Sequence, residues 1–246
     1  MVLLVTGGGR GIGAATARLA AAKGWSVCVN YLHDQRSAEA VVADAINLGV
    51  HAVAFRADVA VERDVTDMFK AVDQELGPIT GLVNNAATLE PQMRLESMVG
   101  ARLQRMFATN AIGPMLCARE AVARMSTKQG GTGGAIVNVS SLAAKSGSPN
   151  EYLDYAATKG AIETFTVGLS REVALEGIRV NAVRPGFIYT GLHAKGGEPN
   201  RVDRVMELTP MKRGGQPAEV AAAILWLLSD EASYVSGATL DVAGGL

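Results

Sequence analysis

Short runs of apolar, β-branched residues alternate along the chain with longer stretches whose apolar positions recur every three to four residues. The short runs are typical of strands buried on both faces, and the longer stretches are typical of amphipathic helices. The pattern predicts strands at residues 2–5, 26–31, 51–56, 81–84, 135–139, 179–184 and 239–242. It predicts helices at residues 13–23, 38–48, 62–76, 103–125, 152–176 and 217–229.

This alternation predicts an α/β fold, a doubly wound parallel sheet of the Rossmann-like kind with helices on both faces. No linker, repeat or low-complexity segment interrupts it, so a single domain over residues 1–246 is expected. Gly113-Pro114 is expected to bend the helix at 103–125. The long irregular stretch at about 189–216 is interpreted as a substrate lid, with a solvated surface loop as the alternative.

Composition narrows the functional classes. Hydrophobic residues make up 48% of the 246 residues, charged residues 19%, and the formal net charge is −1, so no strong field favours nucleic acid or anionic membranes. The longest fully apolar run, 220–228, is too short to cross a bilayer, and the first strand begins too early for a signal peptide. Cys28 and Cys117 form neither a metal-binding spacing nor a disulfide framework, which favours two buried free thiols and a reducing, cytoplasmic setting.

The first predicted strand leads into a glycine-rich turn, Thr6-Gly7-Gly8-Gly9-Arg10-Gly11-Ile12-Gly13, that opens a helix. Glycine permits positive φ and leaves no Cβ between backbone and ligand. The helix N-terminus offers N–H groups and partial positive charge to a pyrophosphate. This strand–turn–helix context is the one that a dinucleotide site requires, so the turn is expected to bind one. The expected contacts are Gly7, Arg10, Gly11, Ile12 and Gly13.

The glycine spacing and an ordered set of further motifs resemble the short-chain dehydrogenase/reductase family over the whole chain. These motifs are Asp58-Val59, Asn84-Asn85-Ala86, Asn110, Ser140-Ser141, Tyr155-x-x-x-Lys159 and Pro185-Gly186. One departure is Ala87, where the family usually has glycine. The resemblance implies an oxidoreductase that transfers a hydride between a nicotinamide and a small-molecule carbonyl or alcohol substrate, and that assembles as a homotetramer.

Tyr155 and Lys159 lie four residues apart on a predicted helix, so their side chains share one face. A neighbouring ammonium favours the phenolate and is expected to lower the pKa of the phenol. Such a phenol can protonate a carbonyl oxygen or accept a proton from an alcohol, which makes Tyr155 the expected general acid/base. An isolated pair of this kind is usually structural, and the accompanying motifs favour the catalytic interpretation. The resemblance implies that Lys159 also binds the nicotinamide ribose.

Ser140 and Ser141 end the fifth predicted strand, where neighbouring side chains face opposite sides, so only one is expected to reach the substrate. The resemblance favours Ser141 as the group that polarises the carbonyl, although its distance along the chain from Tyr155 is one residue longer than usual. A backbone-capping role is the alternative. By the same resemblance, Asn110 lies at a helix kink and holds a water that links Lys159 to solvent; a helix-surface asparagine is the alternative.

The resemblance also assigns the remaining cofactor contacts. It implies that Asp58 and Val59 bind the adenine and that Asn84 and Ala86 line the cofactor. The residues expected to close over the nicotinamide carboxamide are Pro185, Gly186, Ile188 and Thr190.

The choice between NADP and NAD depends on the tip of the second strand. Asn30 and Tyr31 stand there, and no acid is present to bind the ribose 2′-hydroxyl of NAD. Arg10, with Arg36 in reach, can bind a 2′-phosphate, so NADP is the expected cofactor. Asp34, a few residues further on, keeps NAD as the alternative.

The substrate is left open by the motifs. Residues 170–173 and 241–245 are similar to 3-oxoacyl-carrier-protein reductases and equally to sugar dehydrogenases and carbonyl reductases. Arg171 matches a carrier-protein contact, but the neighbouring loop 130–134 is not basic. Segment 191–215 has five cations, three carboxylates and no aromatic residue, which favours a polar, anionic carbonyl compound or acyl thioester over a steroid. The alternative is that these charges all face water and do not bear on the ligand. The alternatives are an NAD-dependent sugar or alcohol dehydrogenase of the same family and a non-catalytic dinucleotide sensor.

Overall fold

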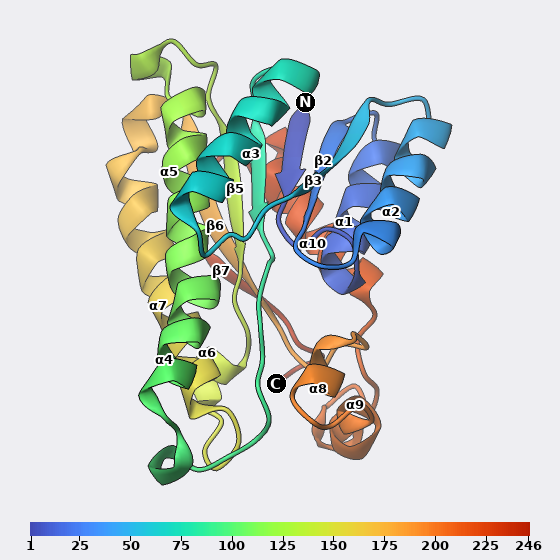
Figure 1. Cartoon of the computed structure of the whole chain (residues 1–246), viewed down its shortest axis with the longest axis vertical. Coiled ribbons are helices and arrows are strands. Elements are labelled where there is room, and N and C mark those ends of the chain that lie inside the picture. Colours follow the sequence, from blue (N-terminus) through green and yellow to red (C-terminus); the bar gives the residue numbers. More distant parts are fainter.

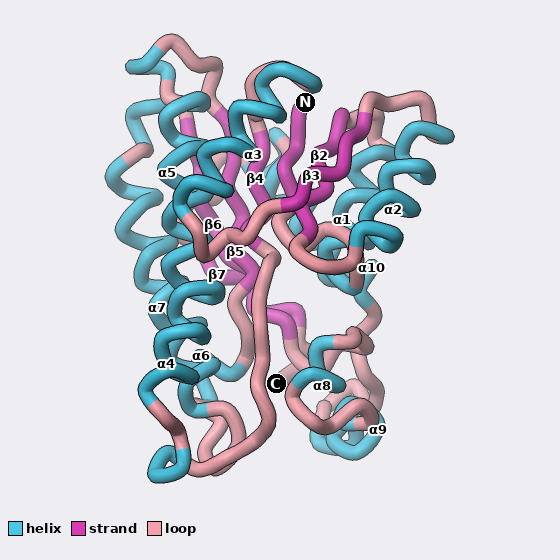
Figure 2. The backbone as a smooth tube through the Cα atoms, viewed as in Figure 1, coloured by secondary structure: helices cyan, strands magenta, loops and turns pink.

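The computed structural model describes all residues from Met1 to Leu246. A seven-stranded parallel sheet lies at its centre, between two layers of helices (Figures 1 and 2). The strand order is β3-β2-β1-β4-β5-β6-β7, so the direction of winding reverses between β1 and β4. The expected doubly wound α/β fold in one domain is confirmed. The strands are β1 (Val2–Val5), β2 (Ser26–Tyr31), β3 (Ala52–Arg56), β4 (Gly81–Asn84), β5 (Gly134–Val139), β6 (Ile178–Pro185) and β7 (Thr239–Val242).

Two helical layers bury two separate cores against the sheet. Within β1, Leu3 and Val5 pack into one core, whereas Leu4 between them packs into the other, because successive strand residues face opposite sides. The first core is covered by α1 (Gly11–Ala22), α2 (Gln35–Asn47) and α10 (Pro217–Leu228). The second is covered by α3 (Glu62–Glu75), α5 (Gly113–Met125) and α7 (Leu153–Glu172). Figure 1 shows these layers to the right and left of the sheet.

The predicted helix at 103–125 is interrupted by a turn that ends directly before Gly113-Pro114, next to the position where a bend was expected. It divides into α4 (Gly100–Phe107), a π-helical turn (Ala108–Ile112) and α5. Gly113 and Pro114 instead form the start of α5, where proline's missing N–H is tolerated. Glycine is needed there because a Cβ at Gly113 would lie 2.9 Å from Cγ2 of Val59.

The segment 189–216, called the lid segment from here, is more regular than the sequence indicated. It contains α8 (Leu192–Lys195) and α9 (Arg201–Val205), which lie at the lower right in Figure 1. Its base is closed by two backbone hydrogen bonds, from Tyr189 N to Gly215 O at 3.0 Å and from Gly215 N to Phe187 O at 2.9 Å. Across from it lie α4 and the short helix α6 (Ala143–Ser146). The lid segment is therefore a closed loop on the sheet's carboxyl edge.

Three further features bear on function. None of the helices combines the length and apolarity needed to cross a membrane. No group of three or more His, Cys, Asp or Glu side chains is arranged to hold a metal ion. Cys28 and Cys117 are buried and unpaired, as expected, and burial raises the pKa of each thiol to about 12.

Candidate active site

A cavity of about 890 Å³ opens at the carboxyl ends of the strands, where the winding of the sheet reverses. Doubly wound folds place their ligand sites at this position. Residues that follow six different strands line its walls, and the lid segment and α7 complete them. The cavity therefore joins the glycine turn at one end to Tyr155 at the other.

The glycine turn between β1 and α1 approaches the cavity with its backbone. Gly7 and Gly11 line the cavity with φ of +60° and +52°, a region that residues with a Cβ rarely adopt. Gly13 does not line the cavity. A Cβ there would lie 2.5 Å from both the Gly7 carbonyl oxygen and Nδ2 of Asn85, so Gly13 is needed for packing. No side chain caps the N-terminus of α1 at Arg10, which leaves its N–H groups available to a ligand.

Two asparagines hold the glycine turn from either side. Asn30 Oδ1 accepts a hydrogen bond from Gly7 N at 3.1 Å, and its Nδ2 donates to Ala57 O at 3.0 Å. Asn85 Nδ2 donates to Thr6 O and Gly7 O at 2.9 and 3.0 Å. Asn30, expected to contact the cofactor, thus has its side-chain groups bound by the protein itself.

Asn84 does not line the cavity, contrary to the role expected for it. Its Nδ2 donates to Pro114 O at 3.1 Å and to Asn138 Oδ1 at 2.9 Å, in the layer between the sheet and α5. It shares its side of β4 with Leu82, so strand periodicity alone would have directed it there. The neighbouring Asn85, beyond the end of the strand, lines the cavity instead.

The residues at the carboxyl ends of β2 and β3 form the wall of the cavity beside the glycine turn. Four residues expected to contact the cofactor line the cavity here: Tyr31, Asp58, Val59 and Ala86.

Arg10 and Asp34 face each other beside those tips, 3.8 Å apart, with 63% and 38% of their side chains exposed. Asp34 also accepts hydrogen bonds from Ser37 N at 3.1 Å and Ser37 Oγ at 2.7 Å. These bonds to Ser37 lower the pKa of the Asp34 carboxyl.

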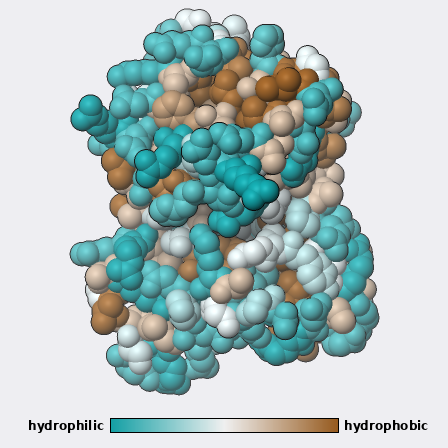
Figure 3. Space-filling model, turned by 45° about the vertical axis from the view of Figure 1, so that its right-hand side comes forward, coloured by the Kyte–Doolittle hydropathy of each residue, from teal (hydrophilic) through white to brown (hydrophobic).

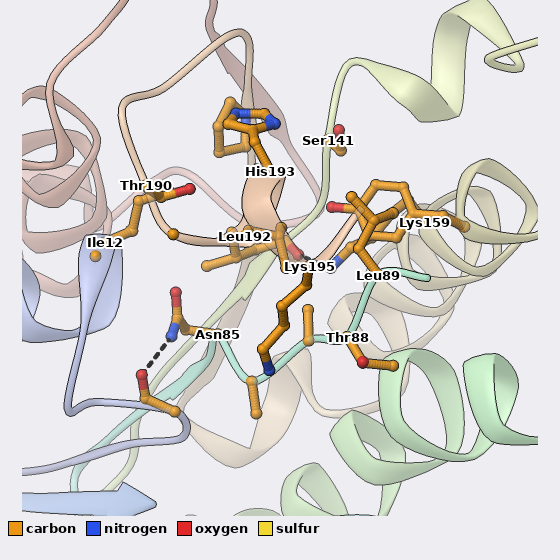
Figure 4. Close-up of a pocket in the computed structure, with 18 of the residues that line it drawn as sticks. Ile12, Asn85, Thr88, Leu89, Ser141, Lys159, Thr190, Leu192, His193 and Lys195 are labelled. Atoms are coloured by element: carbon orange, nitrogen blue, oxygen red, sulfur yellow. Dashed lines mark hydrogen bonds between the residues drawn. The ribbon is translucent and has the colours of Figure 1, made fainter. Parts of the chain in front are cut away.

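Tyr155 and Lys159 lie one turn apart on α7, at the opposite end of the cavity. Both are nearly buried, with 8% and 3% of their surface exposed. Lys159 Nζ donates to Val139 O at 2.7 Å and lies 5.5 Å from the centre of the Tyr155 ring. Both side chains of the expected pair line the cavity, and Figure 4 shows Lys159 on its wall.

The pKa values of this pair differ from the sequence-based expectation. Burial raises the pKa of Tyr155 to about 12, and the hydrogen bond with Ser141 opposes that rise. Burial also lowers the pKa of Lys159 to about 8. Desolvation is the largest cause of the pKa shift at Tyr155, and the charge of Lys159 is not among the effects that oppose it. The protein groups alone keep Tyr155 protonated at neutral pH.

The two serines after β5 have different surroundings. Ser140 Oγ donates to Glu163 Oε1 at 2.7 Å, and Glu163 is in turn bound by Arg184 at 2.8 Å. Ser141 Oγ instead accepts a hydrogen bond from Ala143 N at 3.2 Å, the capping contact given above as the alternative, and it also lies close enough to the Tyr155 phenol to lower its pKa. Both serines line the cavity, and Ser141 is the one placed beside Tyr155.

Asn110 is fully buried in the π-helical turn, where a kink was expected. Its Nδ2 donates to Thr88 O at 2.9 Å, and its Oδ1 accepts from Thr88 N at 2.8 Å. Both side-chain groups thereby hold the loop that follows β4, and Asn110 itself does not line the cavity.

The start of the lid segment forms the roof of the cavity. Pro185, Gly186, Ile188 and Thr190 line it as expected, and Thr190 touches the glycine turn: its Cγ2 would lie 3.3 Å from a Cβ at Gly11.

Three residues of α8, Leu192, His193 and Lys195, also line the cavity and were missed by the motifs (Figure 4). The positive charge of the segment was the one signal for them. His193 is half-buried with Nε2 3.1 Å from Ile188 O, and burial lowers its pKa. Hydrophilic side chains cover most of the lower part of the face in Figure 3, where the lid segment lies.

A buried ion pair beneath Tyr155 was also missed. Arg102 donates to Asp154 from Nε at 2.7 Å, and their side chains are 2% and 0% exposed. Asp154 Oδ1 accepts from Tyr155 N at 2.9 Å, and Arg102 Nη1 donates to Pro91 O at 2.7 Å. The pair thus ties α4, the loop after β4 and the first turn of α7 together.

Known proteins match the chain over nearly its whole length. The family model described as enoyl-(acyl carrier protein) reductase matches residues 7–246. The chain is 56% identical over 244 residues to the uncharacterized oxidoreductase YgfF of Escherichia coli strain K12, covering 99% of both chains. It is 38% identical over 250 residues to a 3-oxoacyl-[acyl-carrier-protein] reductase of Synechocystis sp., covering 100% of this chain and 96% of the relative. It is 37% identical over 256 residues to a glucose and ribitol dehydrogenase homolog of Oryza sativa, covering 100% and 85%.

Proposed function

The chain belongs to the short-chain dehydrogenase/reductase family of oxidoreductases, and from that premise we propose that it is an NADP-dependent enzyme that interconverts a small carbonyl compound and its alcohol. The observation that carries this proposal is the meeting of Tyr155, Ser141 and Lys159 at one end of the cavity whose other end is the glycine turn.

The glycine turn fits the diphosphate of a dinucleotide. Gly7 and Gly11 bring backbone to the cavity surface without a Cβ, and the uncapped N-terminus of α1 adds N–H donors and partial positive charge. Asp58 and Val59 would hold the adenine, and Lys159 would hold the nicotinamide ribose. When bound, the nicotinamide supplies or accepts the hydride.

Arg10 supports NADP as the cofactor. Its guanidinium is exposed at the cavity rim, where it can bind a 2′-phosphate. Asp34, the acid that favours NAD, has its carboxyl bound by Ser37 and faced by Arg10, which leaves it less free to accept from a ribose hydroxyl. NAD is the alternative, and the comparison of both cofactors in Arg10 variants discriminates them.

The chain's own residues provide the proton transfer. Tyr155 is protonated at neutral pH, as a phenol with a pKa near 10 already would be and as burial reinforces by raising its pKa to about 12. In carbonyl reduction its hydroxyl therefore donates a proton to the carbonyl oxygen. Ser141 Oγ accepts from Ala143 N, so its own hydroxyl proton can be donated to the same oxygen and polarise the carbonyl. The Lys159 ammonium, one helical turn away, stabilises the phenolate that remains. In alcohol oxidation the same groups act in reverse.

Replacing Tyr155 with phenylalanine tests the proposal. Tyr155→Phe removes the transferable proton and keeps the ring, so turnover should fall by roughly 10²–10⁴-fold while NADPH affinity is retained. The measurement is NADPH absorbance during reduction of a panel of small ketones and aldehydes, with fluorescence titration for affinity. Tyr234→Phe, at a fully exposed tyrosine, is the matched control. Near-normal turnover in Tyr155→Phe would overturn the mechanism.

The assembly is proposed to be a homotetramer, in a reducing, cytoplasmic setting that the two free thiols favour. Apolar side chains remain exposed along α4 and α5, among them Phe107 at 37%, Ile112 at 49% and Met115 at 36%. Such a face needs a partner, and closed symmetric assemblies are the common solution. Light scattering at micromolar protein should give four times the chain mass, and a monomer mass would exclude the tetramer.

The lid segment is proposed to cover the substrate, because its residues complete the cavity next to Tyr155.

A further inference from the structure

The cations of the lid segment differ in whether the protein already neutralises them. Arg201 pairs with Glu151 and Glu198, and Arg204 pairs with Glu198. Arg213 pairs with Glu219 at 2.6 Å, and Lys212 Nζ donates to Glu207 O. The main-chain carbonyl that binds Lys212 carries no charge, so Lys212 is held but not neutralised. Lys195 has neither a carboxylate within 4.0 Å nor a side-chain hydrogen bond, and it lines the cavity, as Lys212 does not. Three of the five cations are therefore neutralised by carboxylates, and among the lid-segment cations that line the cavity only Lys195 is not.

Lys195 lies on the wall of the cavity and its side chain extends into it. Figure 4 shows its side chain running from the lid segment into the cavity, toward the loop that carries Asn85 and Thr88. The next residue anchors its backbone: Gly196 O accepts a hydrogen bond from the buried Tyr152 Oη at 3.1 Å.

The anchor leaves little freedom at this point. A Cβ at Gly196 would lie 2.7 Å from both Leu89 Cδ2 and Tyr152 Oη, so the backbone packs closely on the wall of the cavity. Tyr152 precedes Tyr155 by less than one turn of α7. The position of the lysine is thereby coupled to the helix that carries the expected acid/base.

The carboxylates that line the cavity are already engaged. Asp34 is bound by Ser37, and Glu90 accepts from Arg105 at 3.0 Å. Glu151 accepts from Arg201, and Asp58 Oδ1 accepts from Ala60 N at 2.9 Å. No acidic side chain of the protein is thus positioned to neutralise Lys195, and an anionic ligand would meet an unopposed ammonium.

We propose that Lys195 is the anion-binding residue of the substrate pocket, and that the substrate carries a carboxylate or phosphate group in addition to its carbonyl. This rests on the proposed oxidoreductase function and specifies its substrate class. An ammonium at the wall of a partly enclosed cavity forms a charge-assisted hydrogen bond with such a group. A neutral substrate of the same size gains nothing from it, so Lys195 determines specificity. The anionic oxygen could also belong to the dinucleotide's phosphates, and the experiment separates these sources.

The probes are succinic semialdehyde, which is anionic, and its neutral methyl ester. Their binding is measured by calorimetry in the Tyr155→Phe background with NADPH bound, so that no turnover is needed. We expect the anionic probe to bind more tightly than the ester, and Lys195→Met to reduce the ratio of the two affinities by about tenfold, which corresponds to about 1.4 kcal/mol. Lys195→Glu should reduce the ratio further, and Lys195→Arg should restore most of it.

Lys212→Met, at a lid-segment cation that does not line the cavity, is the matched control and should leave the ratio unchanged. An unchanged ratio in Lys195→Met would overturn the proposal, as would a preference for the ester in the parent protein. A loss confined to NADPH affinity would assign the anion to the cofactor and also overturn it. Failure of the oxidoreductase function appears separately, as absent NADPH turnover with every carbonyl compound in the unsubstituted protein.

Discussion

The two ends of the cavity present different kinds of surface. The dinucleotide end is formed by the glycine turn, residues 6–13, and the lid end by the lid segment and the residues that face it. At the dinucleotide end, backbone atoms of the glycine turn form the surface, and Asn30 and Asn85 hold that backbone from behind. At the lid end, side chains form the surface, and a network of charged residues such as Glu151 and Arg201 sets their positions. Backbone geometry depends on a few glycines, whereas a side-chain network depends on every member.

This difference explains how one fold can serve several substrates. The relative from Synechocystis is named for acyl-carrier-protein substrates and the one from Oryza sativa for glucose and ribitol, yet both match this chain over almost its whole length. A backbone site for the shared cofactor tolerates change around it, while exchanging a few lid side chains changes the charge that a substrate meets. The lid end is therefore where specificity should be sought.

The largest expected effect compares Arg102 of α4, in the buried ion pair next to Tyr155, with Arg204 of the lid segment. Arg102→Met leaves Asp154 charged, buried and unpaired, so the free energy of unfolding should fall by about 3–5 kcal/mol. Arg204→Met breaks an ion pair whose arginine side chain is 56% exposed, so it should change the free energy of unfolding little. Urea denaturation of both variants measures the difference.

The double variant Arg102→Met/Asp154→Leu sharpens this comparison. Removing both charges should recover much of the stability lost in Arg102→Met, because the cost comes from the unpaired carboxylate. Equal stability of Arg102→Met and Arg204→Met would mean that burial does not distinguish the two pairs.

A smaller effect is expected at the dinucleotide end from one methyl group. Gly13→Ala introduces a Cβ 2.5 Å from Gly7 O and Asn85 Nδ2, so the turn must move. Overpacking of this kind should lower the free energy of unfolding by about 1–3 kcal/mol and weaken NADPH binding. Gly100→Ala, at a glycine with no atom within 4 Å of the added Cβ, is the control and should not destabilise the protein. Unchanged NADPH affinity in Gly13→Ala would show that the turn is not the cofactor cradle.

The smallest expected effect is on cofactor affinity, and it comes from Arg10, the side chain proposed to bind the 2′-phosphate at the dinucleotide end. Arg10→Ala should weaken NADPH binding by about tenfold and NADH binding much less, because only NADPH carries the 2′-phosphate. Arg18→Ala, at an exposed arginine of α1 that pairs with Asp44, is the matched control. Fluorescence titration with both cofactors measures the change. An equal loss for both would remove Arg10 from the phosphate site and favour NAD.

Local patterns in the sequence were enough for the scaffold. All seven predicted strands begin and end within one residue of those found, because apolar runs bounded by turn residues depend on neighbours along the chain. The glycine turn was predictable for the same reason, since positive φ at Gly7 and Gly11 is a local requirement. Strand periodicity could also have corrected the role expected for Asn84. Asn84 lies two residues after Leu82, so its side chain faces the same core and points away from the cavity.

Other features could not be obtained from local pattern. Arg102 and Asp154 carry no motif, and the burial that raises the pKa of Tyr155 to about 12 arises from segments packed around α7. The lid segment's charge was visible in the sequence, but the partners of each cation were not.

The amino-acid sequence by itself determined the sheet, the glycine turn and the pairing of Tyr155 with Lys159 on one helix face, because each depends on residues within a turn or a strand of one another. Only the tertiary structure decided that Asn85 supports the turn and that Lys195 alone of the lid segment's cations lacks a partner. Asn85 bonds to a residue 79 positions away and Arg201 to one 50 positions away. Contacts over such separations depend on how the whole chain packs.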